Sequence, residues 1–154
     1  MQSSIATVPR REHTRVFTLL SLLLLLGAIP AAQAQLAPSV EIECSPIEIP
    51  VEVDLGSPAT GTTTCTLTND SLIQQEVNIT VDVVDLLYAA PESVDVPPNS
   101  DATFQVVYRA ELGDPVKNIQ SDINARVESW NGFPSPTASE ETFQVTIAIQ
   151  QFGR

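Results

Sequence analysis

Two cysteines are the residues whose type and spacing point most directly to a chemical bond. Cys44 and Cys65 are the only cysteines among the 154 residues, and the only histidine is His13. Because the spacing is not C-x-x-C and no nearby imidazole can activate a thiolate, a redox or nucleophilic pair is disfavoured. An even cysteine count in an exported chain favours a disulfide. Closing this loop of about 22 residues would stabilise the fold by roughly 3 kcal/mol.

Acidic side chains are the second group that could do chemistry. Three pairs could give oxygen ligands to Ca²⁺: Asp82 with Asp85, Asp95 with Asp101, and Glu140 with Glu141. Calcium takes about six to eight oxygen ligands, and no EF-hand-like spacing is present. In a chain this acidic a solvated face is the favoured interpretation. We therefore expect no metal site and no cofactor.

Aromatic residues and sequons supply the remaining candidates. Trp130, Asn131 and Phe133 head the longest loop, residues 130–141, where exposed aromatics would form a binding loop. The favoured alternative is that Trp130 folds back to cap the core, because large aromatic side chains are highly buried on average. Asn69 and Asn78 begin N-x-[S/T] sequons at expected outward or turn positions, which makes them candidate glycosylation sites.

The first 34 residues have the layout of a secretory signal peptide. Three arginines precede an apolar run at 16–29, and Ala32-Gln33-Ala34 forms an A-x-A cleavage site. Cleavage between Ala34 and Gln35 would release a single domain, residues 35–154, with no stable membrane insertion. An uncleaved anchor is the alternative, although the apolar run is short for a span of about 20 residues. We expect a secreted protein, extracellular or in the cell envelope.

The expected mature chain is strongly acidic. Its 120 residues carry four basic and eighteen acidic side chains, a net charge of −14. Nucleic acid and anionic membranes carry the same sign and become poor partners. The mature chain also has no histidine, the commonest general base. We expect no catalytic residues, since a pair of glycosidase carboxylates would need a cleft that outward-facing acids do not supply.

Alternating apolar and polar residues predict the elements that position these groups. The predicted strands are 40–44, 47–53, 62–69, 74–85, 94–96, 102–109, 119–128 and 142–150. The first two look like one strand divided at Pro46, with the second half crossing to another sheet, and Pro50 marks an edge. GSPATG at 56–61 is predicted as a turn. Seven or eight strands without a helical period indicate an all-β antiparallel two-sheet sandwich.

Three segments carry a resemblance to a known class of domain. VPPNSDATFQVVY and the preceding CTLTND and QQEVNITVDV resemble steps of the immunoglobulin-like (Ig-like) β-sandwich domains of exported prokaryotic proteins, such as the cell-adhesion-related domains found in bacteria. The resemblance covers residues 39–152. It implies a non-enzymatic binding, structural or adhesive role, with a protein or glycan partner at the cell surface. Two alternatives remain open: a homo-oligomer that assembles a surface filament or layer, and an accessory or inhibitor module of a secreted enzyme.

Overall fold

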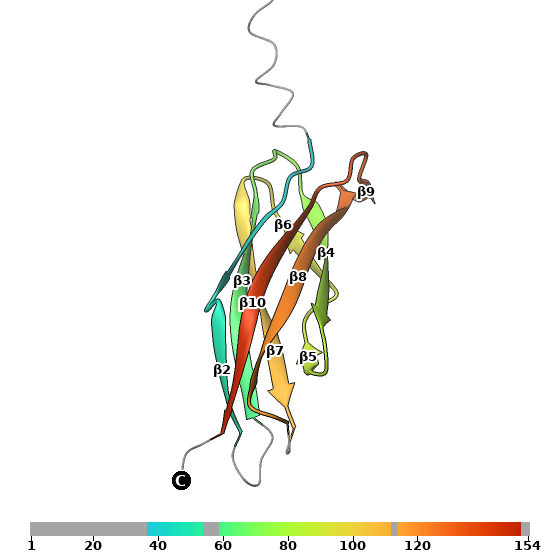
Figure 1. Ribbon diagram of the computed structural model, residues 1–154. Coiled ribbons are helices and arrows are strands. Elements are labelled where there is room, and N and C mark those ends of the chain that lie inside the picture. Colours follow the sequence, from blue (N-terminus) through green and yellow to red (C-terminus); the bar gives the residue numbers. More distant parts are fainter. Residues whose placement is uncertain (1–36, 54–58, 112–113, 152–154) are drawn as a thin grey trace, which may run out of the picture. The chain divides into compact units, whose positions relative to one another are not determined.

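Two β-sheets pack face to face in the part of the chain that the computed structural model describes, residues 37–53, 59–111 and 114–151 (Figure 1). The predicted signal peptide and its cleavage site lie outside these residues. The strands are β1 Glu41–Ser45, β2 Glu48–Val53, β3 Ala59–Asn69, β4 Gln75–Val83, β5 Leu87–Ala89, β6 Ser93–Val96, β7 Ser100–Ala110, β8 Lys117–Trp130, β9 Phe133–Pro134 and β10 Glu140–Gln151.

The order of the strands confirms the predicted two-sheet sandwich. One sheet has the order β1-β3-β7-β5, and the other has the order β2-β10-β8-β4-β6, with β9 paired to β8. The described residues form ten strands rather than seven or eight, because the short pieces β5 and β9 were predicted as connections. The pairs are antiparallel except β2 with β10, which is parallel. The purely antiparallel arrangement was therefore wrong at this one edge.

Period-2 alternation places the core where it was predicted. Along β7 the side chains of Phe104, Val106 and Tyr108 are buried, while Gln105 and Arg109 are exposed. The same alternation holds along β3, β4 and β8, and the inward side chains join in one cluster between the sheets. Burying each large apolar side chain contributes about 1.5–3 kcal/mol.

The first strand crosses from one sheet to the other, as the sequence predicts. β1 pairs with β3, and after a cis Ser45–Pro46 peptide the chain enters β2, which pairs with β10. The buried hydroxyl of Thr63 donates a hydrogen bond to the carbonyl oxygen of Pro46 (2.9 Å). β2 is an edge strand that contains Pro50, so its place also agrees with the prediction.

The prediction of a turn over residues 56–61 was wrong for the last three residues, which belong to a strand. Residues 54–58 lie outside the described part, but Ala59, Thr60 and Gly61 already belong to β3. A Cβ at Gly61 would lie 2.5 Å from Cγ2 of Ile49 and 2.8 Å from Cγ2 of Val51. This glycine therefore allows β2 to pass close over β3, a role that local turn chemistry conceals.

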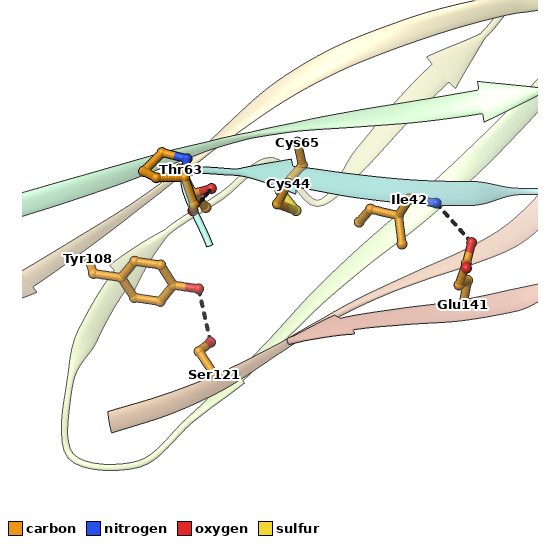
Figure 2. Close-up of a disulfide and its surroundings, with 8 residues drawn as sticks. Ile42, Cys44, Thr63, Cys65, Tyr108, Ser121 and Glu141 are labelled. Carbon is orange, nitrogen blue, oxygen red and sulfur yellow. Dashed lines mark hydrogen bonds between the residues drawn. A yellow bond between two sulfur atoms is a disulfide. The ribbon is translucent and has the colours of Figure 1, made fainter. Parts of the chain in front are cut away.

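The disulfide fixes the start of this crossing (Figure 2). Cys44 and Cys65 are register partners on β1 and β3, with their Cα atoms 4.0 Å apart, and their sulfur atoms are bonded. The predicted pairing is confirmed.

A side chain from the other sheet bonds to the free edge of β1. The amide of Ile42 donates a hydrogen bond to Oε2 of Glu141 on β10 (2.8 Å), so this edge amide has a partner within the fold.

A buried polar pair also joins the sheets. The hydroxyl of Tyr108 on β7 donates to Oγ of Ser121 on β8 at 2.9 Å, and both side chains are buried (Figure 2). Burial raises the pKa of the Tyr108 phenol, and the hydrogen bond with Ser121 offsets part of that rise. The folded state therefore favours the neutral form of the phenol.

We predict that Gly61→Ala lowers the free energy of unfolding by about 1–3 kcal/mol, because the new methyl group meets β-branched side chains that cannot move aside freely. Urea unfolding measures the loss. Thr62→Ala, at an exposed position of the same strand, is the control and should change stability by less than about 1 kcal/mol. Equal effects of the two substitutions would contradict the close approach.

We also predict a fall in stability at alkaline pH that depends on Tyr108. Because its folded pKa is raised, its contribution is complete below the unfolded pKa of about 10 and is lost as pH rises through the folded pKa. The slope reaches at most about 1.4 kcal/mol per pH unit. Tyr108→Phe should flatten the fall, whereas Tyr88→Phe, at a half-exposed position, should not. Unfolding curves across this pH range measure the free energy of unfolding of each variant. The same dependence of that free energy on pH in both variants would refute the prediction.

Candidate functional site

A two-residue hairpin joins β8 to β9 and carries the predicted binding residues. Asn131 and Gly132 both have positive φ, 52° and 79°. Turns of this kind match the twist of the flanking strands and favour Asn-Gly. Trp130 pairs with Phe133 across the turn. The residues predicted as the start of a long loop therefore form a regular hairpin.

The two aromatic side chains of this hairpin have different surroundings. Trp130 is half-buried, and its register partner on β4 is the fully buried Gln75. Paired residues share a face of the sheet, so Trp130 and Gln75 lie on the same side of the sheet, and the favoured expectation that Trp130 caps the core stays a prediction. Phe133 is 70% exposed. Trp130 anchors the hairpin, and Phe133 remains available at the surface.

Backbone hydrogen bonds connect the hairpin to two neighbouring turns. The amide of Asn131 donates to the carbonyl oxygen of Gln74 (2.9 Å), and the amide of Asn99 donates to that of Ser71 (3.0 Å). The hairpin 130–133 and the turns 70–74 and 97–99 therefore form one end of the sandwich, which we call the hairpin end. Leu72, 51% exposed, adds a second apolar side chain there.

Asn69 lies at the centre of a buried hydrogen-bond network behind the hairpin end. Its Nδ2 lies within hydrogen-bond distance of three carbonyl oxygens: those of Ile73 (2.9 Å), Val96 (3.1 Å) and Pro97 (3.0 Å). Its side chain is 1% exposed. The amide thus ties the end of β3 to the turn before β4 and to the end of β6.

The acceptor oxygen of the same side chain completes the network. Oδ1 of Asn69 accepts from the amide and hydroxyl of Ser71 (2.9 and 2.7 Å) and from Nε2 of Gln75 (2.9 Å). Two buried atoms beside it, Oε1 of Gln75 and Nε1 of Trp130, have no hydrogen-bond partner among the described residues. They are an acceptor and a donor on paired residues. The hydrogen bonds of the network therefore end at Gln75, whose Nε2 also donates to Oγ of Ser71 (2.8 Å).

The placement of Asn69, buried at the end of β3, corrects the prediction that the sequon asparagines lie at outward or turn positions. Asn69 continues the inward series of Cys65 and Leu67 on β3, and its polar atoms are tolerated inside because they are hydrogen-bonded. Asn78 does lie on the outer side of β4, half-exposed, where its Nδ2 donates to the carbonyl oxygen of Glu92 (3.2 Å). Glycosylation of either residue stays a prediction.

The fold does not gather the predicted carboxylate pairs into one site. Asp95 lies on β6 and Asp101 on β7, in different sheets. Glu140 and Glu141 are neighbours on a strand, so their side chains point to opposite faces. Asp85 forms an ion pair with Lys117 (3.9 Å). Across residues 37–53, 59–111 and 114–151, no three or more His, Cys, Asp and Glu side chains are grouped so that they could hold a metal ion.

Acidic side chains also line a shallow hollow on the outer face of β4, β8 and β10. It measures about 530 Å³ and includes Asp82, Asp122 and Glu140. Asn124 donates to Oε1 of Glu140 (2.7 Å), and Gln144 donates to Oδ1 of Asp122 (2.9 Å). These carboxylates are therefore bonded to neighbouring amides on the sheet surface.

In the described part of the chain, no helix is both long and apolar enough to cross a membrane.

Comparison with known proteins supports the fold. No protein-family model matches the chain, and no curated protein matches it. The seventh PapD-like domain of human CEP192 is similar in structure, with a TM-score of 0.51 and 12% identity over 75% of this chain and 89% of that one. Escherichia coli α2-macroglobulin, from domain MG7 to the C-terminus, has a TM-score of 0.53 and 19% identity over 76% of this chain and 17% of that one. The chain thus has the fold of an Ig-like β-sandwich.

The sequence interpretation found the hairpin aromatics but not the network behind them. Asn69, Ser71 and Gln75 lie within a short stretch around a turn, and each is an ordinary turn or strand residue when taken alone. Alternation from Cys65 was the available signal, because it places position 69 on the inner face. Leu72 carried no such signal, since the apolar pair Leu72-Ile73 in a turn does not by itself predict which of the two side chains is exposed.

We predict that Asn69→Ala lowers the free energy of unfolding by about 2–3 kcal/mol, because it leaves buried donors and acceptors unmatched. Asn78→Ala is the matched control, since it removes the other sequon asparagine from a half-exposed position, and should cost less than about 1 kcal/mol. Urea unfolding measures both. If Asn69→Ala were as mild as Asn78→Ala, the network would not hold the hairpin end together.

Proposed function

We propose that this chain is an exported, non-enzymatic Ig-like domain that binds a protein partner through its hairpin end. The observation that carries the proposal is the pairing of an exposed phenyl ring with a fixed backbone. Phe133 is 70% exposed, while the turn beside it is held by the hydrogen bond from Asn131 to Gln74. Such a site presents a side chain for contact without first ordering a loop.

The energetics favour an anchor of this kind. Transferring a phenyl ring from water into a partner's apolar pocket stabilises a complex by about 1.5–3 kcal/mol. Ordering a flexible side chain or loop on binding costs about 0.5–1.5 kcal/mol for each immobilised side chain. The hairpin reduces that cost because its backbone is already fixed. Leu72 extends the apolar contact beyond the ring.

Charge and chemistry narrow the class of partner. A net charge of −14 on the expected mature chain favours neutral or basic surfaces over acidic ones. Phe133 and Leu72 offer apolar contact, which suits a protein pocket better than a polyhydroxylated glycan. If the protein partner is a secreted enzyme, the chain would act as its accessory or inhibitor module.

The expected location rests on the signal peptide and the disulfide. An A-x-A site after an apolar run directs a chain to export, and a structural disulfide such as Cys44–Cys65 forms and persists in oxidising compartments. We place the working domain outside the cytoplasm, secreted or in the cell envelope. The non-enzymatic assignment is supported by the outward position of Asp122 and Glu140 and by their bonds to neighbouring amides.

Binding to envelope fractions of the producing cells tests the proposal. The labelled wild-type protein should bind, and Phe133→Ser should lose at least about tenfold in affinity, because it removes the anchor. Ile47→Ser is the control, since Ile47 is 59% exposed at a distant junction of β1 and β2. Unchanged binding by Phe133→Ser, or an equal loss with Ile47→Ser, would refute the hairpin end as the binding surface.

The chemistry of the partner is read from the same assay. Protease treatment of the envelope fraction should remove binding, whereas periodate treatment, which oxidises the diols of sugars, should leave it. The reverse pattern would replace a protein partner with a glycan.

A further inference from the structure

The tip of the hairpin combines two residue types that can react with each other. Asn131 is the only asparagine in the chain that is followed by glycine, and both Asn131 and Gly132 are exposed. The side-chain amide of an asparagine can be attacked at Cγ by the backbone nitrogen of the next residue. Glycine in that next position has no side chain to hinder the attack. The tip therefore carries the residue pair that a self-modification of the chain requires.

The peptide group between Asn131 and Gly132 is held by no contact of the described residues. Its carbonyl oxygen and its N–H take part in no hydrogen bond there. A Cβ added at Gly132 would have no neighbour within 4 Å, so open space surrounds this peptide. The bond from the amide of Asn131 to the carbonyl oxygen of Gln74 belongs to the preceding peptide. The peptide after Asn131 can therefore rotate while the hairpin stays attached.

Rotation of this peptide brings the reacting atoms together. Positive φ at both central residues defines the turn as type I′. Rotating the central peptide gives type II′, the other two-residue turn that fits a hairpin, with ψ of about −120° at the first central residue. At that value the nitrogen of Gly132 eclipses Cβ of Asn131 and lies beside its Cγ. Asn131 keeps its positive φ, and Gly132 adopts either sign of φ without strain.

We propose that Asn131 deamidates spontaneously and that this modification ends partner binding at the hairpin end. A base removes the proton from the amide of Gly132, and its nitrogen forms a bond to Cγ of Asn131. The bond between Cγ and Nδ2 breaks, and the amino group takes up a proton and leaves as ammonia. The product is a five-membered succinimide. Water opens this ring at either carbonyl and gives aspartate or isoaspartate, so the only co-reactant is water.

Both products change the surface around Phe133. Aspartate replaces a neutral amide by a carboxylate two residues away from the exposed ring. Isoaspartate also carries the backbone through Cβ, which adds one methylene between Trp130 and Phe133. Because loop length sets the register of a hairpin, the pairing of Trp130 with Phe133 is displaced. The loss of binding rests on the proposed function, whereas the chemistry of Asn131 does not.

Asn99 provides an internal comparison, because it shares most features of Asn131. It is exposed, its φ is 46°, and its amide donates to a turn carbonyl, that of Ser71 (3.0 Å). The residue after it is Ser100, which begins β7, and its side chain crowds the nitrogen that would attack. Exposure and positive φ are therefore matched in the two asparagines, and the residue that follows them differs.

Peptide mapping by mass spectrometry tests the chemistry, on the folded full chain kept at neutral pH and sampled over time. Asn131 should be converted to aspartate and isoaspartate at least about tenfold faster than Asn99, because the side chain of Ser100 raises the barrier to attack. Asn131→Gly is the matched variant, since Gly-Gly also favours a type I′ turn, and it should release no ammonia from this position. Conversion of Asn131 no faster than that of Asn99 would overturn the proposal.

The envelope-binding assay tests the consequence on fresh and aged protein. The deamidated fraction should bind at least about tenfold more weakly than fresh wild type, because Phe133 has lost its position. Asn131→Gly should keep its binding through the same ageing. Unchanged binding after conversion of Asn131 would overturn this consequence. Failure of the proposed function is distinguishable, because fresh wild type and fresh Phe133→Ser would then bind equally, whatever the rate of conversion.

Discussion

The passage of the first strand from one sheet to the other is the constraint on which the rest of the sandwich depends. Three contacts hold it: the Cys44–Cys65 bond before the crossing, the Thr63 hydroxyl on the carbonyl of Pro46 at it, and the missing side chain of Gly61 beneath β2. Because β2 keeps the direction of β1 but joins β10, this edge is parallel while the neighbouring pairs are antiparallel. Both sheets are thereby fastened along the same side of the core.

These contacts lie along one side of the sandwich, so they do not involve the turns at its hairpin end. At the hairpin end, the side chain of Asn69 on β3 donates hydrogen bonds to the turn before β4 and to the end of β6. The turns there are therefore part of the packed structure. Trp130 is half-buried at the base of the hairpin, whereas Phe133 is exposed. The separation of an anchoring aromatic from an exposed one makes the hairpin a preformed contact surface.

Alternation in the sequence predicted most of the fold, because a half-buried strand imposes it residue by residue. The core positions of β7, the inward Cys44 and Cys65 and the crossing at Pro46 all follow from it. The role of Gly61 was missed because the side chains that require a glycine there belong to β2, and a glycine in a stretch that also contains glycine, serine and proline is ordinary turn chemistry. Asn69 was predicted in a turn because Asn-Asp-Ser is ordinary turn chemistry, whereas its burial depends on carbonyl groups contributed by other turns. β5 is too short for a periodic signal.

The central claim is that the hairpin end is rigid before it meets a partner. Amide hydrogen exchange on the wild-type protein tests this most directly, because the amides of Ser71, Asn99 and Asn131 each donate to an identified acceptor there. The account predicts that these three amides are protected nearly as well as those of the central strands. Exchange as fast as in the exposed loop at 136–138 would contradict it, because the tip would then be a flexible loop that a partner must order.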